Sequence, residues 1–243
     1  LLLFLLGFIQ IYSQDQEIDS LNVQKLEEVL VSSIRVNEDI PMAFTNVSKD
    51  QIEERNLGQD LPILLNFLPN VVTTSDAGAG IGYTGIRIRG INSQSTNVTI
   101  NGIPYNDAES NLTYWVDLPD FSSSIENLQV QRGIGTSVNG SGAFGASINI
   151  LTENISQDPF FESNNTLGSY NTYKNTFRFS TGLLNDVFEF SGRLSKIDSD
   201  GYIDRASSDL KSYFLQASYK KNNTLIKLLN FGGHEITYHA WNG

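Results

Sequence analysis

The 243-residue chain contains no cysteine, which excludes disulfides, thiolate nucleophiles and metal sites built on cysteine. Histidine is scarce as well, because only His234 and His239 could supply an imidazole. Basic residues are few: 16 lysines and arginines stand against 27 aspartates and glutamates, which gives a net charge of -11. A nucleic-acid binder needs clustered positive charge against the phosphates, so we expect no nucleic-acid partner.

Sequence motifs of the common enzyme classes are also missing. The chain has no GxxxxGK(S/T), no HExxH and no GxSxG. The pattern GxGxxG occurs at Gly80 to Gly85 and at Gly140 to Gly145. In a dinucleotide site such glycines open a helix, whereas each of these segments precedes a strand pattern. We therefore expect no enzyme, no catalytic residues, no cofactor and no metal site.

The first residues form a short apolar run, Leu1 to Ile9, which is followed by polar residues and by the small Ser13. A run of this kind is typical of the apolar centre of a secretory signal peptide, and it is shorter than the about 20 apolar residues of a membrane-spanning helix. We interpret residues 1–13 as the remnant of a signal peptide, with a buried strand or helix as the alternative. We also expect a fragment that is open at both ends, because the chain stops at Gly243 directly after an aromatic stretch.

Residues 14–40 form an acidic, polar tail that contains one short patch of β-forming residues. The patch consists of Glu27, Glu28, Val29, Leu30 and Val31. An extended peptide of this composition can add a strand to the exposed edge of another protein's sheet. The alternative is an ordinary first strand of the next domain, and the residues alone leave both interpretations open.

Residues 41–152 carry a compact pattern of short helices and strands. Ser48 and Gln51 form a capping box for one helix, and a second helix begins near Asp60 with Pro62 in its first turn. A glycine-rich loop follows at Asp76 to Gly85. Strand patterns occur at Ile86 to Gly90, Asn97 to Ile100, Ile103 to Tyr105, Ile125 to Val130 and Ala146 to Leu151, with a hairpin turn at Asn101-Gly102 and a helical piece around Leu118 to Ser124. These patterns predict a small α+β domain.

From Pro159 onward the chain changes to long segments in which apolar and polar residues alternate. In one segment, Tyr173, Phe177 and Phe179 share one face. The opposite face carries Thr172, Lys174, Thr176, Arg178 and Ser180. Such segments, joined alternately by tight turns and by a longer polar loop, are typical of antiparallel strands that cross an outer membrane. A soluble β-sandwich is the alternative, since it uses the same alternation in shorter strands.

Three segments together resemble the TonB-dependent outer-membrane receptors. They are LEEVLVSS (Leu26 to Ser33), IRIRGINSQSTNVTINGIPYND (Ile86 to Asp107) and IENLQVQRGIGTSVNGSGAFGASINI (Ile125 to Ile150). In that family a plug domain sits inside a 22-stranded barrel, and a periplasmic tail carries a TonB box that pairs with TonB as an added strand. The resemblance implies a periplasmic tail at residues 14–40, a plug at 41–152 and the first strands of an incomplete barrel at 153–243. Glu27 to Val31 would then be the TonB box.

The resemblance also implies a function and its partners. The protein would transport a ferric chelate, such as a siderophore or ferric citrate, across the bacterial outer membrane, whose lipid would surround the strands. TonB, energised through ExbB and ExbD, would pull the tail and remodel the plug. Outward plug loops would contact the ligand, with packing against the barrel wall as an equal alternative. The candidate contact residues are Asp76, Tyr83, Asn106, Tyr114 and Trp115.

Four further plug positions match charged residues of the family: Arg87, Arg89, Glu126 and Arg132. Because buried charges need partners, we expect them to pair with one another or with barrel carboxylates.

Two alternatives to ferric-chelate transport stay open. A glycan importer resembling SusC carries a PLYVIDG motif in the plug, whereas this chain has VTINGIP at Val98 to Pro104, which favours a ferric chelate. A β-rich surface protein that binds without transporting would fold in water and would not bind TonB.

Overall fold

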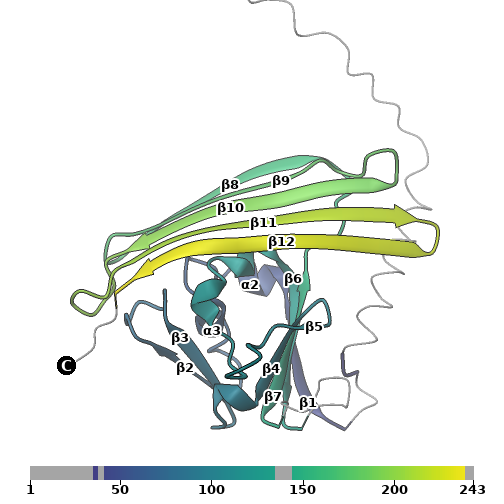
Figure 1. Cartoon of the computed structure of the whole chain (residues 1–243). Coiled ribbons are helices and arrows are strands. Elements are labelled where there is room, and N and C mark those ends of the chain that lie inside the picture. The colour runs from purple at the N-terminus through teal and green to yellow at the C-terminus, as the bar shows by residue number, and fades with distance from the viewer. Residues whose placement is uncertain (1–34, 38–40, 135–143, 239–243) are drawn as a thin grey trace, which may run out of the picture.

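Two packed bodies make up the computed structural model, which describes residues 35–37, 41–134 and 144–238. A curved sheet of five long strands lies over a smaller mixed body, which contains short helices, a five-stranded sheet and a two-stranded sheet (Figure 1). The expected fold class, an α+β domain followed by antiparallel strands, is therefore confirmed.

Two short α-helices lie in the smaller body. Helix α2 (Lys49–Glu53) begins after Ser48, whose hydroxyl accepts from the Gln51 amide at 3.4 Å while the Gln51 side chain accepts from the Ser48 amide at 3.1 Å. This is the predicted capping box. Helix α3 (Leu61–Leu64) begins after Asp60, as predicted. Within the described ranges, no helix is long and apolar enough to cross a membrane.

The helical piece expected around Leu118 to Ser124 is instead split into two 3-10 turns, η2 (Trp115–Asp117) and η3 (Phe121–Ser124). Two features of the residues between them explain the break. Pro119 disfavours a helical conformation at the residue before it. Asp120 adopts a left-handed conformation with φ of 52°, which ends any right-handed helix. A third 3-10 turn, η1 (Ser93–Ser95), directly precedes the strand that begins at Thr96.

The five-stranded sheet has the order β1-β6-β7-β4-β5. Its strands are β1 (Ala43–Ser48), β4 (Thr96–Ile100), β5 (Ile103–Pro104), β6 (Ile125–Arg132) and β7 (Ala146–Thr152). Only the β4–β7 pairing is parallel among these described strands. Asn101 and Gly102 join β4 to β5 with φ of 49° and 80°, so the predicted tight turn is confirmed. A separate hairpin pairs β2 (Val71–Ser75) with β3 (Thr84–Ile88).

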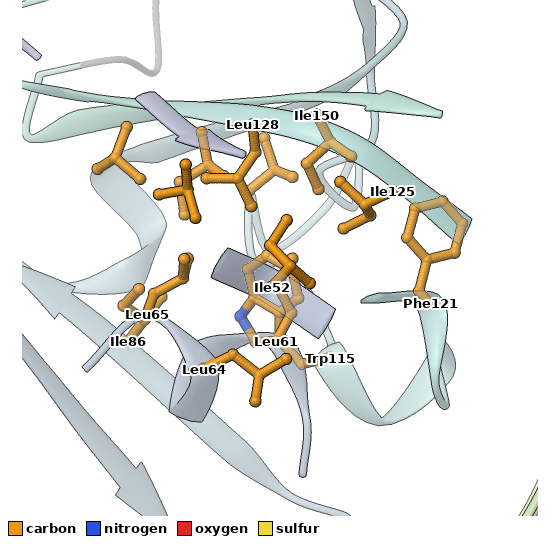
Figure 2. Packing of buried hydrophobic residues seen from close by; sticks show 14 of the residues in the cluster. Ile52, Leu61, Leu64, Leu65, Ile86, Trp115, Phe121, Ile125, Leu128 and Ile150 are labelled. Atoms are coloured by element: carbon orange, nitrogen blue, oxygen red, sulfur yellow. The ribbon is translucent and has the colours of Figure 1, made fainter. Parts of the chain in front are cut away.

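The hydrophobic core lies between the five-stranded sheet and the helices. Figure 2 shows Ile52, Leu61 and Leu64 opposite Leu128 and Ile150 of the sheet. All five side chains are buried. Burying a side chain of this size stabilises the fold by about 1.5–3 kcal/mol, so the core holds the smaller body together without any contribution from disulfides.

The five long strands pair antiparallel in sequence order. They are β8 (Phe160–Gly168), β9 (Thr172–Ser180), β10 (Phe188–Ser199), β11 (Ser208–Lys221) and β12 (Thr224–Thr237). A two-residue turn joins β11 to β12, whereas the loop between β10 and β11 spans residues 200–207. Strand β12 contains His234, and His239 lies outside the described residues.

Strands β9, β10 and β11 bury a mainly polar face and expose a mainly apolar face. In β9, Lys174 and Arg178 are buried, whereas Tyr173 and Phe177 are 48% and 43% exposed. Strand β10 repeats the pattern, with Leu194 exposed. A soluble sandwich would bury the apolar face instead. Apolar residues outside and polar residues inside are the pattern of transmembrane β-strands.

A buried carboxylate joins the two bodies. The Asp120 side chain, which is fully buried, lies 2.7 Å from Lys174 Nζ in β9 and 3.4 Å from an Arg193 nitrogen in β10. Its Oδ2 also accepts from the hydroxyls of Thr176 and Ser195, both at 2.6 Å. Burial alone would raise the pKa of Asp120, but the charges of Lys174 and Arg193, with hydrogen bonds from Lys174 and Ser123, hold it below its usual value. The carboxylate is therefore ionised at neutral pH.

Further contacts extend this junction on both sides. Glu153, which follows β7, contacts Arg178 of β9 and lies 3.1 Å from Lys49 of α2. An aromatic cluster completes the junction, since the Phe121 ring lies 5.8 Å from Phe214 and 5.3 Å from Phe231 between ring centroids. The smaller body thus meets the long strands mainly through charged and polar groups.

We predict that Asp120→Asn weakens the attachment of the smaller body to the long strands. The substitution leaves Lys174 and Arg193 buried without a counter-charge, which costs about 3 kcal/mol or more of unfolding free energy. Urea unfolding of the full-length protein in detergent measures this loss. The matched control is Asp198→Asn, which breaks the exposed pair with Lys196 (2.8 Å) and should cost below about 1 kcal/mol. Equal losses in the two variants would contradict the prediction.

Candidate functional site

The glycine-rich segment forms a loop at one end of the smaller body, and we call residues 76–83 the apical loop. The amides of Tyr202 and Ile203, in the β10–β11 loop, donate to the Ala77 carbonyl at 2.9 and 3.2 Å. Gly78 has a φ of 71°, and a Cβ there would lie 2.9 Å from the Tyr202 ring, so only glycine allows this close approach. The apical loop therefore lies at the same end of the long strands as the β10–β11 loop.

A hollow of about 140 Å³ opens beside the apical loop. It is lined by Tyr83, Thr84, Gly85, Ser93, Leu112, Thr113, Tyr114, Trp115 and Val116. Tyr83 and Tyr114 are 40% and 42% exposed. Their rings can stack on a ligand and their hydroxyls can form hydrogen bonds with it. The hollow is small, so it would hold only one part of a ligand of drug size.

The five residues proposed from the sequence as ligand contacts have different surroundings. Tyr83, Tyr114 and Trp115 all line the hollow. Trp115, however, is buried and belongs to the hydrophobic core cluster of the smaller body. Asp76 is exposed at the base of the apical loop, where its amide donates to the Tyr83 carbonyl at 3.0 Å, and it does not line the hollow.

Asn106 shapes the loop before η2 instead of presenting its amide to a ligand. Its Oδ1 accepts from the Val98 amide at 2.7 Å, and its Nδ2 donates to the carbonyls of Thr96 and Asn111 at 2.9 Å. These three bonds hold the loop against β4. The sequence alone could not distinguish loop support from ligand contact, because an asparagine in a loop is suited to both.

A buried carboxyl group beneath the apical loop was missed as a site residue. Asp60 donates its amide to the Gly80 carbonyl at 2.9 Å, and its Oδ2 accepts from the Thr84 hydroxyl at 2.8 Å. Its Oδ1 has no hydrogen-bond partner among the described residues. Burial raises the pKa of Asp60 well above its usual value, although hydrogen bonds from Thr84 and Gly82 act in the opposite direction. The sequence marked Asp60 only as the residue before a helix.

The four charged positions expected to pair are Arg87, Arg89, Glu126 and Arg132. The contacts that the structure describes differ from the expected ones. Arg87 and Arg89 are exposed, because the alternation of β3 turns Ile86 and Ile88 into the core. Glu126 lies 3.9 Å from Lys49 within the smaller body, and Arg132 donates to the Thr45 hydroxyl at 2.9 Å. Among the described residues of the smaller body, Asp120, Glu153 and Glu53 make the ion pairs that cross to the long strands.

Two other predicted segments, the signal peptide at residues 1–13 and the TonB box at Glu27 to Val31, lie outside the described residues. In the part of the chain that the structure describes, no group of three or more histidines or carboxylates is placed to hold a metal ion.

We predict that Asp60 makes the stability of the smaller body depend on pH. Its pKa is raised above the usual 3.8, so the folded state binds the proton more tightly than the unfolded chain, and stability falls as the pH rises through the folded pKa. Asp60→Asn should remove this decline. Urea unfolding of the full-length protein over a pH series measures it. Asp76→Asn, which changes an exposed carboxylate of the apical loop, should keep the decline; if the Asp60 variant keeps it too, the assignment is wrong.

Comparison with known proteins agrees with the observed fold, a small α+β body that packs against long antiparallel strands. Residues 36–147 match the TonB-dependent Receptor Plug Domain. The chain is 31% identical over 183 residues to the vitamin B12 transporter BtuB of Vibrio vulnificus, covering 74% of this chain and 29% of that protein. It is 27% identical over 210 residues to the probable TonB-dependent siderophore receptor PirA of Acinetobacter baumannii, covering 81% and 25%. The chain thus spans less than a third of the length of these relatives.

A solved structure shares the fold. The ferripyoverdine receptor of the outer membrane of Pseudomonas aeruginosa superposes with a TM-score of 0.66 at 16% identity, covering 83% of this chain and 26% of that one. The relatives are transporters and receptors, which confirms the expectation that the chain is not an enzyme. With a plug domain beneath strands that turn their apolar face outward, the chain belongs to the TonB-dependent receptors of the bacterial outer membrane.

Proposed function

We propose that the full-length protein takes up a ferric chelate, either a siderophore or ferric citrate, through the outer membrane with energy supplied by TonB. The observation that carries the proposal is the reversed burial of the long strands over the plug. Their apolar face requires hydrocarbon around it, and their charged face meets a folded domain instead of open water. In the proposed complete barrel, the plug would have to move before a solute could pass, and TonB would drive that movement.

The relatives support a small nutrient as the ligand, without choosing among nutrients. One is named as a siderophore receptor and another as a vitamin B12 transporter. A cobalamin is therefore the second candidate, because one relative is named as a vitamin B12 transporter. Exposed tyrosines beside the hollow can bind either class through stacking and hydrogen bonds.

In this proposal each segment has one task. Residues 1–13 direct export, and residues 14–40 form the periplasmic tail. Residues 41–152 are the plug, which presents Tyr83 and Tyr114 to the ligand. Residues 153–243 are the first strands of the barrel. TonB, energised through ExbB and ExbD, binds Glu27 to Val31 as an added strand and pulls on the tail.

We predict that Tyr83→Ala and Tyr114→Ala each weaken ligand binding. Loss of one aromatic contact removes about 1 kcal/mol, which raises Kd roughly fivefold. Intrinsic fluorescence titration of the full-length protein with ferric citrate, a ferric hydroxamate and cyanocobalamin measures binding and identifies the ligand class. Tyr173→Ala is the matched control, because Tyr173 is similarly exposed but lies on the outward face of β9.

A rise in Kd for the Tyr173 variant equal to that of the other two would contradict the ligand site at the hollow. If cyanocobalamin binds and neither ferric chelate does, the proposed ligand becomes a cobalamin. Binding of none of the three probes would overturn both.

We also predict that a peptide of residues 14–37 binds the C-terminal domain of TonB in isothermal titration calorimetry. Val29→Pro should abolish binding, because proline cannot donate its amide to the partner strand. Ser20→Pro, which lies outside the proposed box, should bind as well as the original peptide. Absence of binding by the original peptide would show that Glu27 to Val31 is not a TonB box.

A further inference from the structure

The exposed face of the long strands carries a row of polar side chains beside apolar ones. Strand register sets Lys196 of β10 opposite Lys211 of β11, with Asn175 of β9 and His234 of β12 at the two ends of the row. All four residues are exposed. The four strands lie side by side (Figure 1). Because Lys174 precedes Asn175 in β9 and contacts the plug, the row faces away from the plug.

A groove of about 690 Å³ opens at this row, and one side of the groove is apolar. The apolar side consists of Phe177, Leu194 and Tyr213, which are the next outward residues of β9, β10 and β11. These three residues lie opposite one another in the strand register, as the polar row does. We call the row and these three residues the outer groove. Its lining is amphipathic, with cations on one side and hydrocarbon on the other.

The outer groove lies near the ends of the long strands. Lys196, Lys211 and His234 are each three residues from the nearer end of their strand. At about 3.3 Å per residue, the row is about 10 Å from the strand ends. The apolar side of the groove lies farther from these ends. In a strand that crosses a membrane, this is the level where headgroups replace hydrocarbon, and a lysine there can extend its ammonium into the headgroups.

The row brings two positive charges together. Like charges directly opposite each other on neighbouring strands repel. Each lysine also has a carboxylate on its own strand, since Lys196 Nζ lies 2.8 Å from Asp198 and Lys211 Nζ lies 3.9 Å from Asp209. These pairs are exposed and therefore contribute little to stability. An ammonium has three donors, so each lysine can bind a further anion placed between the two.

We propose that the outer groove binds an anionic lipid of the membrane. The lipid phosphate lies between Lys196 and Lys211, and an acyl chain lies along Phe177, Leu194 and Tyr213. The side chains at the two ends of the row can donate further hydrogen bonds to headgroup oxygens. The lipid is a bound component of the receptor and is separate from the transported nutrient, so this inference does not depend on the proposed function.

Both sides of the groove are needed to identify its ligand. A free phosphate ion would neutralise the lysines but would leave the apolar side uncovered. An apolar protein segment would cover the apolar side but would leave the two positive charges unmatched. A lipid with a negatively charged headgroup satisfies both sides. Lipid is also the molecule that surrounds strands with an outward apolar face.

Native mass spectrometry of the full-length protein in a non-ionic detergent tests the site. Phosphatidylglycerol and phosphatidylcholine with identical acyl chains are titrated separately. The wild-type protein should bind phosphatidylglycerol with the lower Kd, because its headgroup has a net negative charge. Lys196→Gln and Lys211→Gln should each raise that Kd about fivefold, the contribution of one lysine near a membrane surface. Lys221→Gln is the matched control, since it removes the same charge at the other end of β11 and should leave the Kd unchanged.

Asp198→Asn supplies a readout that a structural defect would not produce. It breaks the same ion pair as Lys196→Gln, but it leaves the ammonium free for the phosphate. The Kd for phosphatidylglycerol should therefore fall in the Asp198 variant, whereas it rises in the Lys196 variant.

Equal Kd values for the two lipids, or no binding of phosphatidylglycerol, would overturn the lipid site. An equal rise in the Lys221 variant, or a rise in the Asp198 variant, would overturn it as well. Inorganic phosphate at the concentration of the lipid should not displace phosphatidylglycerol, because it has no acyl chain for the apolar side. Displacement would show a site for free phosphate instead.

Discussion

The Asp120 carboxylate supplies the counter-charge for two cations that β9 and β10 turn toward the plug. Lys174 and Arg193 lie on the buried, polar face of these strands, which is turned toward the plug. There they are buried and need an anion. The left-handed turn between η2 and η3 places Asp120 against both cations. The contact between plug and strands follows from this requirement.

The junction differs in kind from the core of the plug. Inside the plug, apolar side chains from α2, α3 and the sheet pack together and exclude water. Between plug and strands, ion pairs and hydroxyl hydrogen bonds occur beside apolar contacts, which Phe121 and Ile81 contribute from the plug. Polar groups can exchange these partners for water, whereas a separated apolar interface would expose its surface. Such a junction is compatible with a plug that moves while its own core stays intact.

Local sequence signals predicted elements well where short-range chemistry decides. The capping box at Ser48, the Asn101-Gly102 turn and the alternation in β9 each depend on neighbouring residues, and each is present. The helix expected near Leu118 failed because Asp120 takes a left-handed conformation that serves its distant partners. Tyr83 and Tyr114 were chosen from the sequence and meet at one hollow, whereas Asn106 is engaged by the backbone of its own loop.

The sequence by itself determined the family and the faces of the long strands, because periodicity and motif are properties of neighbouring residues. Only the tertiary structure decided which charges meet. Asp120 is far from Lys174 and Arg193 along the chain, Asp60 is buried by a loop that follows it, and Gln129 holds Val36 from a strand in the middle of the sheet. Burial and pairing depend on groups brought together by folding, and no local pattern contains that information.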